Sequence, residues 1–180
     1  MSINHLSSIC LQHMSVLFYY LRKKRKYKEV SHAYTTTNTH FTKYVEELHN
    51  EWKSCENPDK FDWSKQSTAQ KIVLGMKSAG NCVCPWVDVG IIYVPFHLKD
   101  HWILLVISLP TKSITVYDSL SYRKGTRDSI AGLAEFLPIL LGSTDAFGSL
   151  KIEDQTSEPF KIIFADDMSQ QHNGYGCLSL

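Results

Sequence analysis

Apolar residues in the first half of the chain recur every three or four positions, which is the spacing of one face of an α-helix. This pattern predicts helices over residues 11–21 and 41–52, and a shorter helix that Ser67 caps and that closes near Gly80. The polar, threonine-rich residues 31–38 are expected to connect the first two helices. The residues expected to face inward are Met14, Leu17, Phe18 and Leu21, then Phe41, Tyr44, Val45, Leu48 and Trp52, then Ile72, Val73 and Met76.

Shorter apolar runs in the second half of the chain have the length and the Ile and Val content of β-strands. Residues 86–95 are expected to form the first strand, which enters the central sheet at Ile91. Turn formers at residues 109–113 separate two further runs, so these runs are expected to pair as an antiparallel hairpin. The strands expected in the sheet are Ile91–Pro95, Trp102–Ser108, Ile114–Asp118 and Phe160–Phe164.

A further helix is expected between the hairpin and the last strand. It follows a loop over Ser119–Thr126, Pro138 kinks or ends it, and Gly142 finishes it. Its inward face is expected to consist of Ile130, Leu133, Ala134 and Leu137. A length of 180 residues suits one domain. The pattern therefore indicates a single α+β domain over residues 1–180.

The composition argues against several classes of protein. The formal net charge is +1, so no overall field draws the chain to nucleic acid or to an anionic membrane. No apolar stretch approaches the roughly eighteen residues of a membrane-spanning helix. The basic residues 22–28 are either a nuclear localisation or nucleic-acid patch or the cationic end of the first helix. We expect no membrane partner, and no nucleic-acid partner is implied.

The five cysteines and the histidines change this picture little. An odd number of cysteines, with no signal-peptide pattern in residues 1–12, favours free thiols and an intracellular protein of the nucleus or cytoplasm. Cys82 and Cys84 are separated by one residue, fewer than in a zinc knuckle, and no second pair follows. We interpret His40 and His49, like His32, as residues of polar faces. No metal and no cofactor are expected.

Residues suited to catalysis lie at the ends of the predicted hairpin. His101 stands at the entrance of one strand and Asp118 closes the next, so a short turn brings both to the same edge of the sheet. There the Asp118 carboxylate can accept the Nδ1 proton of His101 and leave Nε2 as a base. Cys177 is the candidate nucleophile, because the polar, glycine-bearing segment 170–176 before it is able to expose a thiol and to aim amide donors.

The segments around these residues resemble the ubiquitin-like-protein proteases of the SUMO protease type. In that family His-Trp, Tyr-Asp-Ser and Gln-x-Asn-Gly-x-Asp-Cys-Gly follow in this order, and here they are matched by His101-Trp102, by Tyr117-Asp118-Ser119 and by residues 171–178. Residues 13–24 also look like the first helix of plant members. The resemblance spans about residues 12–178. It implies an α+β, papain-like cysteine protease fold with helices packed on a small, mostly antiparallel sheet.

The resemblance implies a role for each matched residue. Cys177 would be the nucleophile, His101 the general base, Asp118 its orienter and Gln171 an oxyanion-hole donor. Trp102 either lines a narrow substrate channel that admits only glycine or packs in the core. The implied substrate is the bond after the C-terminal glycines of a SUMO-type ubiquitin-like protein, in its precursor or in an isopeptide conjugate.

Positions beside Cys177 depart from the family. Gly176 stands where the family usually has Asp, and Leu178 where it usually has Gly. Only three residues follow Cys177, whereas the nucleophile of the family opens a helix that favours the thiolate. We therefore expect the printed chain to be C-terminally incomplete and to be a poor enzyme or none. The alternative function is that of an inactive family member that still binds a ubiquitin-like protein.

Overall fold

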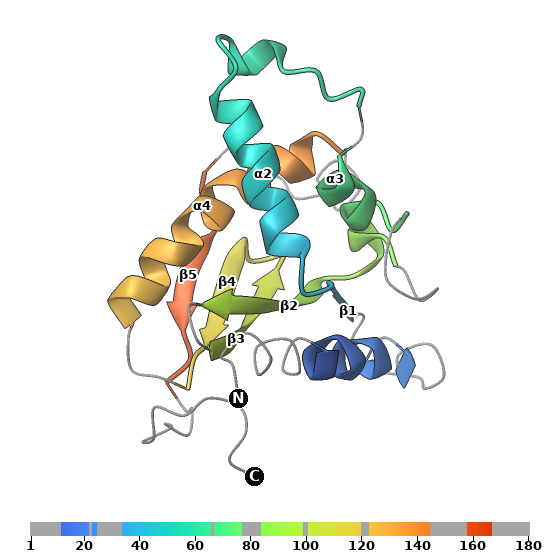
Figure 1. The fold of residues 1–180 in the computed structure, drawn as a ribbon, viewed down its shortest axis with the longest axis vertical. Helices are drawn as coiled ribbons and strands as arrows, with labels where there is room; N and C mark the ends of the chain where they lie inside the picture. Colours follow the sequence, from blue (N-terminus) through green and yellow to red (C-terminus); the bar gives the residue numbers. More distant parts are fainter. Residues whose placement is uncertain are drawn as a thin grey trace, which may run out of the picture.

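A five-stranded sheet forms the centre of the structure, which is a computed structural model of the chain (Figure 1). The strands lie side by side in the order of the sequence. The central strands β2, β3 and β4 pair antiparallel, while the edge strands β1 and β5 pair parallel to β2 and β4, so the sheet is mixed. The strands are β1 (Tyr34–Thr36), β2 (Ile91–Leu98), β3 (His101–Ser108), β4 (Ser113–Tyr117) and β5 (Lys161–Phe164). The predicted hairpin is confirmed as β3 and β4.

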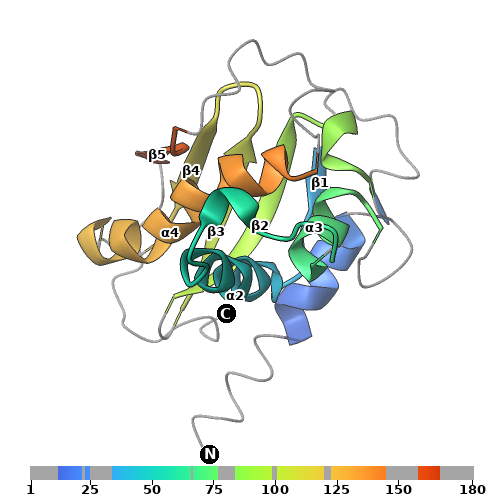
Figure 2. The ribbon, with the colours of Figure 1, turned by 90° about the horizontal axis from the view of Figure 1, so that it is seen from above.

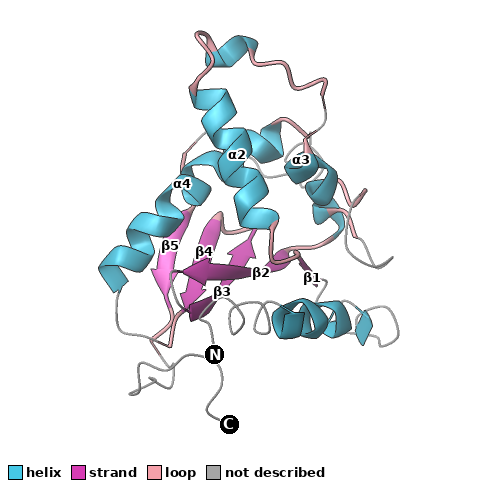
Figure 3. Cartoon of the chain, viewed as in Figure 1, coloured by secondary structure: helices cyan, strands magenta, loops and turns pink. Residues whose placement is uncertain are grey.

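Helices lie on one side of this sheet, as the two views at right angles show (Figures 1 and 2). They are α2 (Phe41–Lys53), α3 (Thr68–Val73) and α4 (Arg123–Gly142), with single 3-10 turns η1 (Pro58–Lys60) and η2 (Trp86–Asp88) in the connections (Figure 3). Residues 12–21 are also helical. The structure describes residues 12–21, 23–24, 34–65, 67–76, 84–98, 101–119, 123–144 and 158–166.

The core lies between the sheet and the helices. Alternate residues of β3 are fully or almost fully buried, as the period of two in a strand requires. Helix α4 contributes most of the opposing surface. Buried residues of β3, β4 and α4 include Ile103, Leu105, Ile107, Ile114, Val116, Ile130, Ala134, Leu137, Leu140 and Leu141. Within the described residues no helix has the length and apolar character needed to cross a membrane.

An aromatic cluster, formed by His49, Trp52, Trp63 and Phe136, joins α2 to α4. Phe136 is fully buried, and its ring centroid lies 4.6 Å from that of His49 and 5.9 Å from that of Trp52. His49 is only 7% exposed, so its interpretation as a residue of a polar face is wrong. The reason is that both α3 and α4 pack against α2. The sequence analysis assumed a single buried face, so it overestimated the width of the polar face.

Two connections and two single residues differ from the sequence-based expectation. Residues 34–36, expected within a polar connector, form β1. Threonine is favourable in strands, but three residues are too few for an alternating pattern to be recognised in the sequence. Residues 86–88, expected to be strand, form the 3-10 turn η2 after Pro85. Two residues expected to face inward are exposed, Leu17 at 52% and Met76 at 65%.

Helix α4 starts earlier than the sequence suggests, and it ends at Gly142 as expected. It begins at Arg123, within the expected loop, and runs past Pro138 to Gly142. Proline has no N–H with which to bond the carbonyl four residues before it. Here that carbonyl, of Ala134, accepts a hydrogen bond from the backbone N–H of Phe160 at 3.0 Å. The unpaired carbonyl that a mid-helix proline normally leaves is thus satisfied from outside the helix.

Candidate active site

The ends of two neighbouring strands bring His101 and Asp118 together. His101 is the first residue of β3, and Asp118 directly follows β4. The antiparallel register, with Leu104 opposite Tyr117, places both side chains at the same edge of the sheet. The distance between His101 Nε2 and Asp118 Oδ1 is 2.9 Å. The contact predicted from the hairpin is therefore present.

The imidazole meets the carboxylate with a different nitrogen from the one expected. We expected Nδ1 to face Asp118, but the nitrogen in contact is Nε2. Because a carboxylate only accepts hydrogen bonds, Nε2 carries the proton in this contact. Nδ1 is then the nitrogen of the neutral ring that bears the lone pair. Sequence reasoning fixes which strand ends meet, but it does not fix the side-chain torsions that decide which nitrogen points where.

The second oxygen of Asp118 has a partner that the sequence analysis missed. The Thr126 hydroxyl donates to Asp118 Oδ2 at 2.8 Å. Thr126 lies in the first turn of α4, is fully buried, and Asp118 is 7% exposed. The side chains of His101 and Asp118 are 13% and 3% exposed. A carboxylate removed from water to this degree needs donors on both oxygens, and the two observed hydrogen bonds provide one each.

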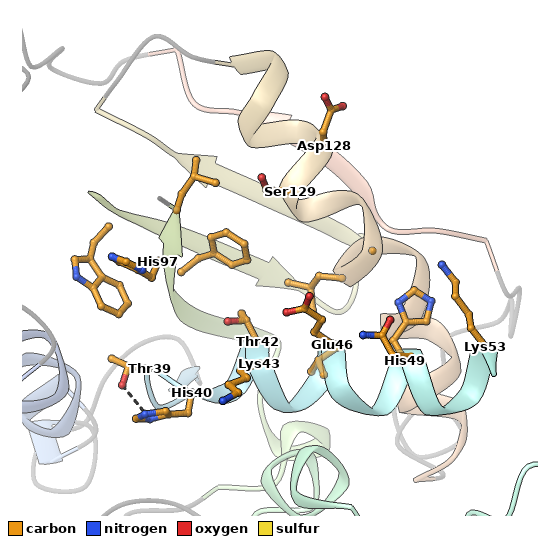
Figure 4. Close-up of a pocket in the computed structure, with 17 residues that line it drawn as sticks. Thr39, His40, Thr42, Lys43, Glu46, His49, Lys53, His97, Asp128 and Ser129 are labelled. Atoms are coloured by element: carbon orange, nitrogen blue, oxygen red, sulfur yellow. Dashed lines mark hydrogen bonds between the residues drawn. The ribbon is translucent and has the colours of Figure 1, made fainter. Parts of the chain in front are cut away.

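A groove runs along α2 from the tips of β2 and β3 to the far end of the helix (Figure 4). Its volume is about 1090 Å³. Trp102 and His97, which are opposite each other in β3 and β2, lie at one end with ring centroids 4.8 Å apart. Trp102 is half-buried rather than sealed in the core. The residue that follows His101 in the chain therefore contributes to the wall of an open groove.

The wall of this groove also holds an uncharged histidine. Burial is the largest influence that lowers the pKa of His49 from 6.5, and the nearby Lys53 ammonium lowers it further. The Glu135 carboxylate acts in the opposite direction, and it pairs with Lys53 at 3.9 Å. At neutral pH His49 is therefore a neutral ring stacked on Phe136.

Other parts of the predicted site lie outside the described residues. These are Cys177, the candidate nucleophile, and Gln171, the candidate oxyanion-hole donor. Among the described residues there are two free cysteines, Cys55 and Cys84, both half-buried. The same part of the chain contains no cluster of three or more His, Cys, Asp or Glu side chains that could hold a metal ion.

Comparison of the sequence with protein families gives one match over most of the chain. Residues 8–177 match the Ulp1 protease family, C-terminal catalytic domain. No curated protein matches the sequence.

Comparison with solved structures leads to the same fold. SUMO protease Ulp1 with its catalytic cysteine oxidized to a sulfinic acid has a TM-score of 0.50 and 19% identity, over 90% of this chain and 58% of that one. The sulfonic acid form has a TM-score of 0.47 and 20% identity, over 79% and 51%. The C-terminal Ulp1 protease domain in complex with SMT3, the yeast ortholog of SUMO, has a TM-score of 0.41 and 18% identity, over 89% and 57%.

The chain thus spans between 51% and 58% of the length of these structures. The first of the three matches, together with the family match, confirms the expected α+β fold of the SUMO protease type.

Proposed function

The chain belongs to the Ulp1 protease family, and from this premise we propose that it is a cysteine-type peptidase that acts on SUMO-type ubiquitin-like proteins or their conjugates. The observation that carries the proposal is the hydrogen bond between His101 and Asp118. A carboxylate that orients an imidazole is what a thiol nucleophile needs to be activated. We take residues 1–180 as one catalytic domain that works in the nucleus or the cytoplasm.

In the proposed mechanism His101 removes the thiol proton of Cys177. Because Nε2 is engaged by Asp118, the nitrogen that accepts this proton is Nδ1. Asp118 stabilises the imidazolium that forms, and the thiolate attacks the carbonyl carbon. Gln171 and backbone amides donate to the developing oxyanion. The imidazolium then gives its proton to the leaving amine, and water hydrolyses the thioester.

The proposed substrate is the bond after the C-terminal glycines of a SUMO-type protein. Two features of the described residues support contact between Trp102 and the substrate. Trp102 directly follows His101, and its indole lies at the end of an open groove rather than inside the core. A glycine has no side chain to collide with an indole in a narrow channel, whereas a bulkier residue does. We therefore propose Trp102 as a substrate-contacting residue.

A SUMO protein that ends in a glycine vinyl sulfone tests the proposal directly, because only a competent thiolate forms a covalent adduct with it. On this proposal Cys177→Ser abolishes any adduct that the chain forms, and His101→Ala slows its formation strongly. Cys55→Ser is the matched control. Its hydroxyl can replace the thiol that donates to the Asn57 carbonyl, so adduct formation should be unchanged.

The outcomes separate the proposal from its alternative. Adduct formation that depends on Cys177, followed by turnover of a fluorogenic SUMO substrate, supports a peptidase. Saturable binding of SUMO without any adduct contradicts the proposal and favours the inactive family member that binds a ubiquitin-like protein. An adduct on Cys55 or Cys84 would show that the nucleophile is wrong.

A further inference from the structure

Asp118 is held from two elements at once. On one side, Oδ1 accepts from His101 at the start of β3, and on the other, Oδ2 accepts from Thr126 in the first turn of α4. The distances of 2.9 Å and 2.8 Å are those of good hydrogen bonds. The two partners lie at opposite ends of the same carboxylate and come from segments that are 25 residues apart in the chain.

The second contact constrains a motion that the first leaves free. A carboxylate with a single partner can rotate about its terminal torsion, which is broad and has no strong staggered minima. When each oxygen has its own donor, the plane of the carboxylate is defined. The direction from which Oδ1 faces the imidazole then depends on the position of Thr126, and therefore on α4.

The burial of Thr126 argues that its hydroxyl serves this contact. Its exposed fraction is 0%, and a buried hydroxyl is costly unless it is hydrogen-bonded. Valine has the same shape and would fill such a position without that cost. The partner found here is a nearly buried carboxylate, and hydrogen bonds to charged groups are stronger than those between neutral groups.

We propose that Thr126 is a positioning residue for the base. It holds the Asp118 carboxylate so that Oδ1 fixes the Nε2–H tautomer of His101 and leaves Nδ1 as the proton acceptor. This inference rests on the proposed function for its catalytic meaning, but the tautomer it specifies is a property of the described residues alone. It can therefore be measured whether or not Cys177 reacts.

Three variants of the full chain test it. Thr126→Val keeps the shape and removes the donor, whereas Thr126→Ser keeps the hydroxyl. Thr35→Val is the control, because Thr35 is also buried and lies on β1, which β2 and β3 separate from β4. The readout is histidine nitrogen NMR, which reports the tautomer of His101 and the exchange of its Nε2 proton with water. Amide spectra of each variant report whether it is folded.

We expect the wild type, Thr126→Ser and Thr35→Val to show a single Nε2–H tautomer with a protected proton. In Thr126→Val that proton should exchange faster, on the order of tenfold or more, and the other tautomer should become visible. In the turnover assay Thr126→Val should lower kcat with little change in KM, and Thr126→Ser should restore it.

The results distinguish this proposal from the proposed function. An unchanged tautomer and unchanged proton exchange in Thr126→Val would overturn the positioning role. The expected NMR change in a chain whose Cys177 forms no adduct would support the positioning role and contradict the peptidase. If Thr126→Val does not fold, the wild-type spectrum tests the proposal instead. We expect the Thr126 hydroxyl proton to be observable in it. Rapid exchange of that proton with water would contradict the proposal.

Discussion

Asp118 uses its two oxygens for two different donors, so a change to asparagine affects both contacts. Asp118→Asn keeps the size, but its amide has one acceptor oxygen and would turn its NH₂ group toward either His101 or Thr126. We expect turnover of a SUMO substrate to fall roughly 10²- to 10⁴-fold, because the imidazole is no longer held in one tautomer. Asp59→Asn, at an exposed position, is the control. Turnover close to that of the wild type in Asp118→Asn would contradict the orienting role.

His49 gives the stability of the molecule a pH dependence with a defined sign. Burial, then Lys53, lowers its pKa in the native state, whereas the unfolded chain keeps the ordinary value near 6.5. Below that value the unfolded state binds more protons than the native state, so the free energy of unfolding decreases as the pH falls. Urea unfolding across the range from neutral to mildly acidic pH measures this slope. We expect His49→Phe, which can keep a ring stacked on Phe136, to flatten it, and an equal slope in both proteins would assign the effect to other groups.

The pairing of His101 with Asp118 could be predicted because a short hairpin determines which strand ends meet. Other details of the site could not. The choice of Nε2 depends on side-chain torsions, and the role of Thr126 depends on α4 beginning before it rather than after it. The only trace of that role in the sequence is a hydroxyl residue near the start of a helix, eight residues after Asp118.

At the scale of elements, the short helix α3 is stabilised at its N-terminus by the side chains of Ser67 and Gln70. The Ser67 hydroxyl accepts from Gln70 N at 3.1 Å, and Gln70 Oε1 accepts from Ser67 N at 2.8 Å, which is a capping box. The Gln70 amide also donates to Ser143 Oγ after α4, at 3.2 Å.

The two halves of the capping box should therefore differ in their effect on stability. Ser67→Ala should lower the free energy of unfolding by about 1 kcal/mol. Gln70→Ala should lower it by more, about 2 kcal/mol, because it removes the link to α4 as well as half of the box. Denaturant titrations measure both values. Equal losses in the two variants would show that the contact with Ser143 contributes nothing.

Elements with a strong periodic pattern could be predicted, and short or interrupted ones could not. β3, β4 and α2 have clear repeats, and their observed bounds lie within one or two residues of the expected ones. β1 has three residues and is defined by its parallel pairing with β2, which no local pattern contains. α4 continues through Pro138 because the Phe160 amide supplies the missing hydrogen bond from a distant part of the chain.

For the molecule as a whole, the aromatic cluster connects α2, the segment after it and α4. Phe136 contacts His49, Trp52 and Trp63, and it is fully buried. Phe136→Ala should lower the free energy of unfolding by about 3 to 5 kcal/mol. Phe61→Ala is the matched comparison, because Phe61 contacts Trp63 at the half-buried margin and should cost clearly less. A small loss in Phe136→Ala would mean that the neighbouring rings close the cavity.

The α+β class followed from the change of period along the chain, from helical spacing before Gly80 to short apolar runs after Trp86. The order of the strands could not be predicted in the same way. Pairing partners are set by contacts far apart in the sequence, and both edge strands pair parallel to their neighbours. The family resemblance implied only a small, mostly antiparallel sheet, and the central strands β2, β3 and β4 agree with it.

Pro138 cannot donate to the Ala134 carbonyl, which therefore accepts a hydrogen bond from the Phe160 amide. As a result, the connection between α4 and β5 is held by a separate hydrogen bond at each end. At its first end the Ser143 N–H donates a hydrogen bond to the Ile139 carbonyl, and at its second end the Phe160 N–H donates to the Ala134 carbonyl. Insertions or deletions between these two anchors would leave both in place, because neither hydrogen bond involves residues 145–157. Evolutionary variation in length should therefore concentrate in this connection, while the start of β5 keeps its position beside β4.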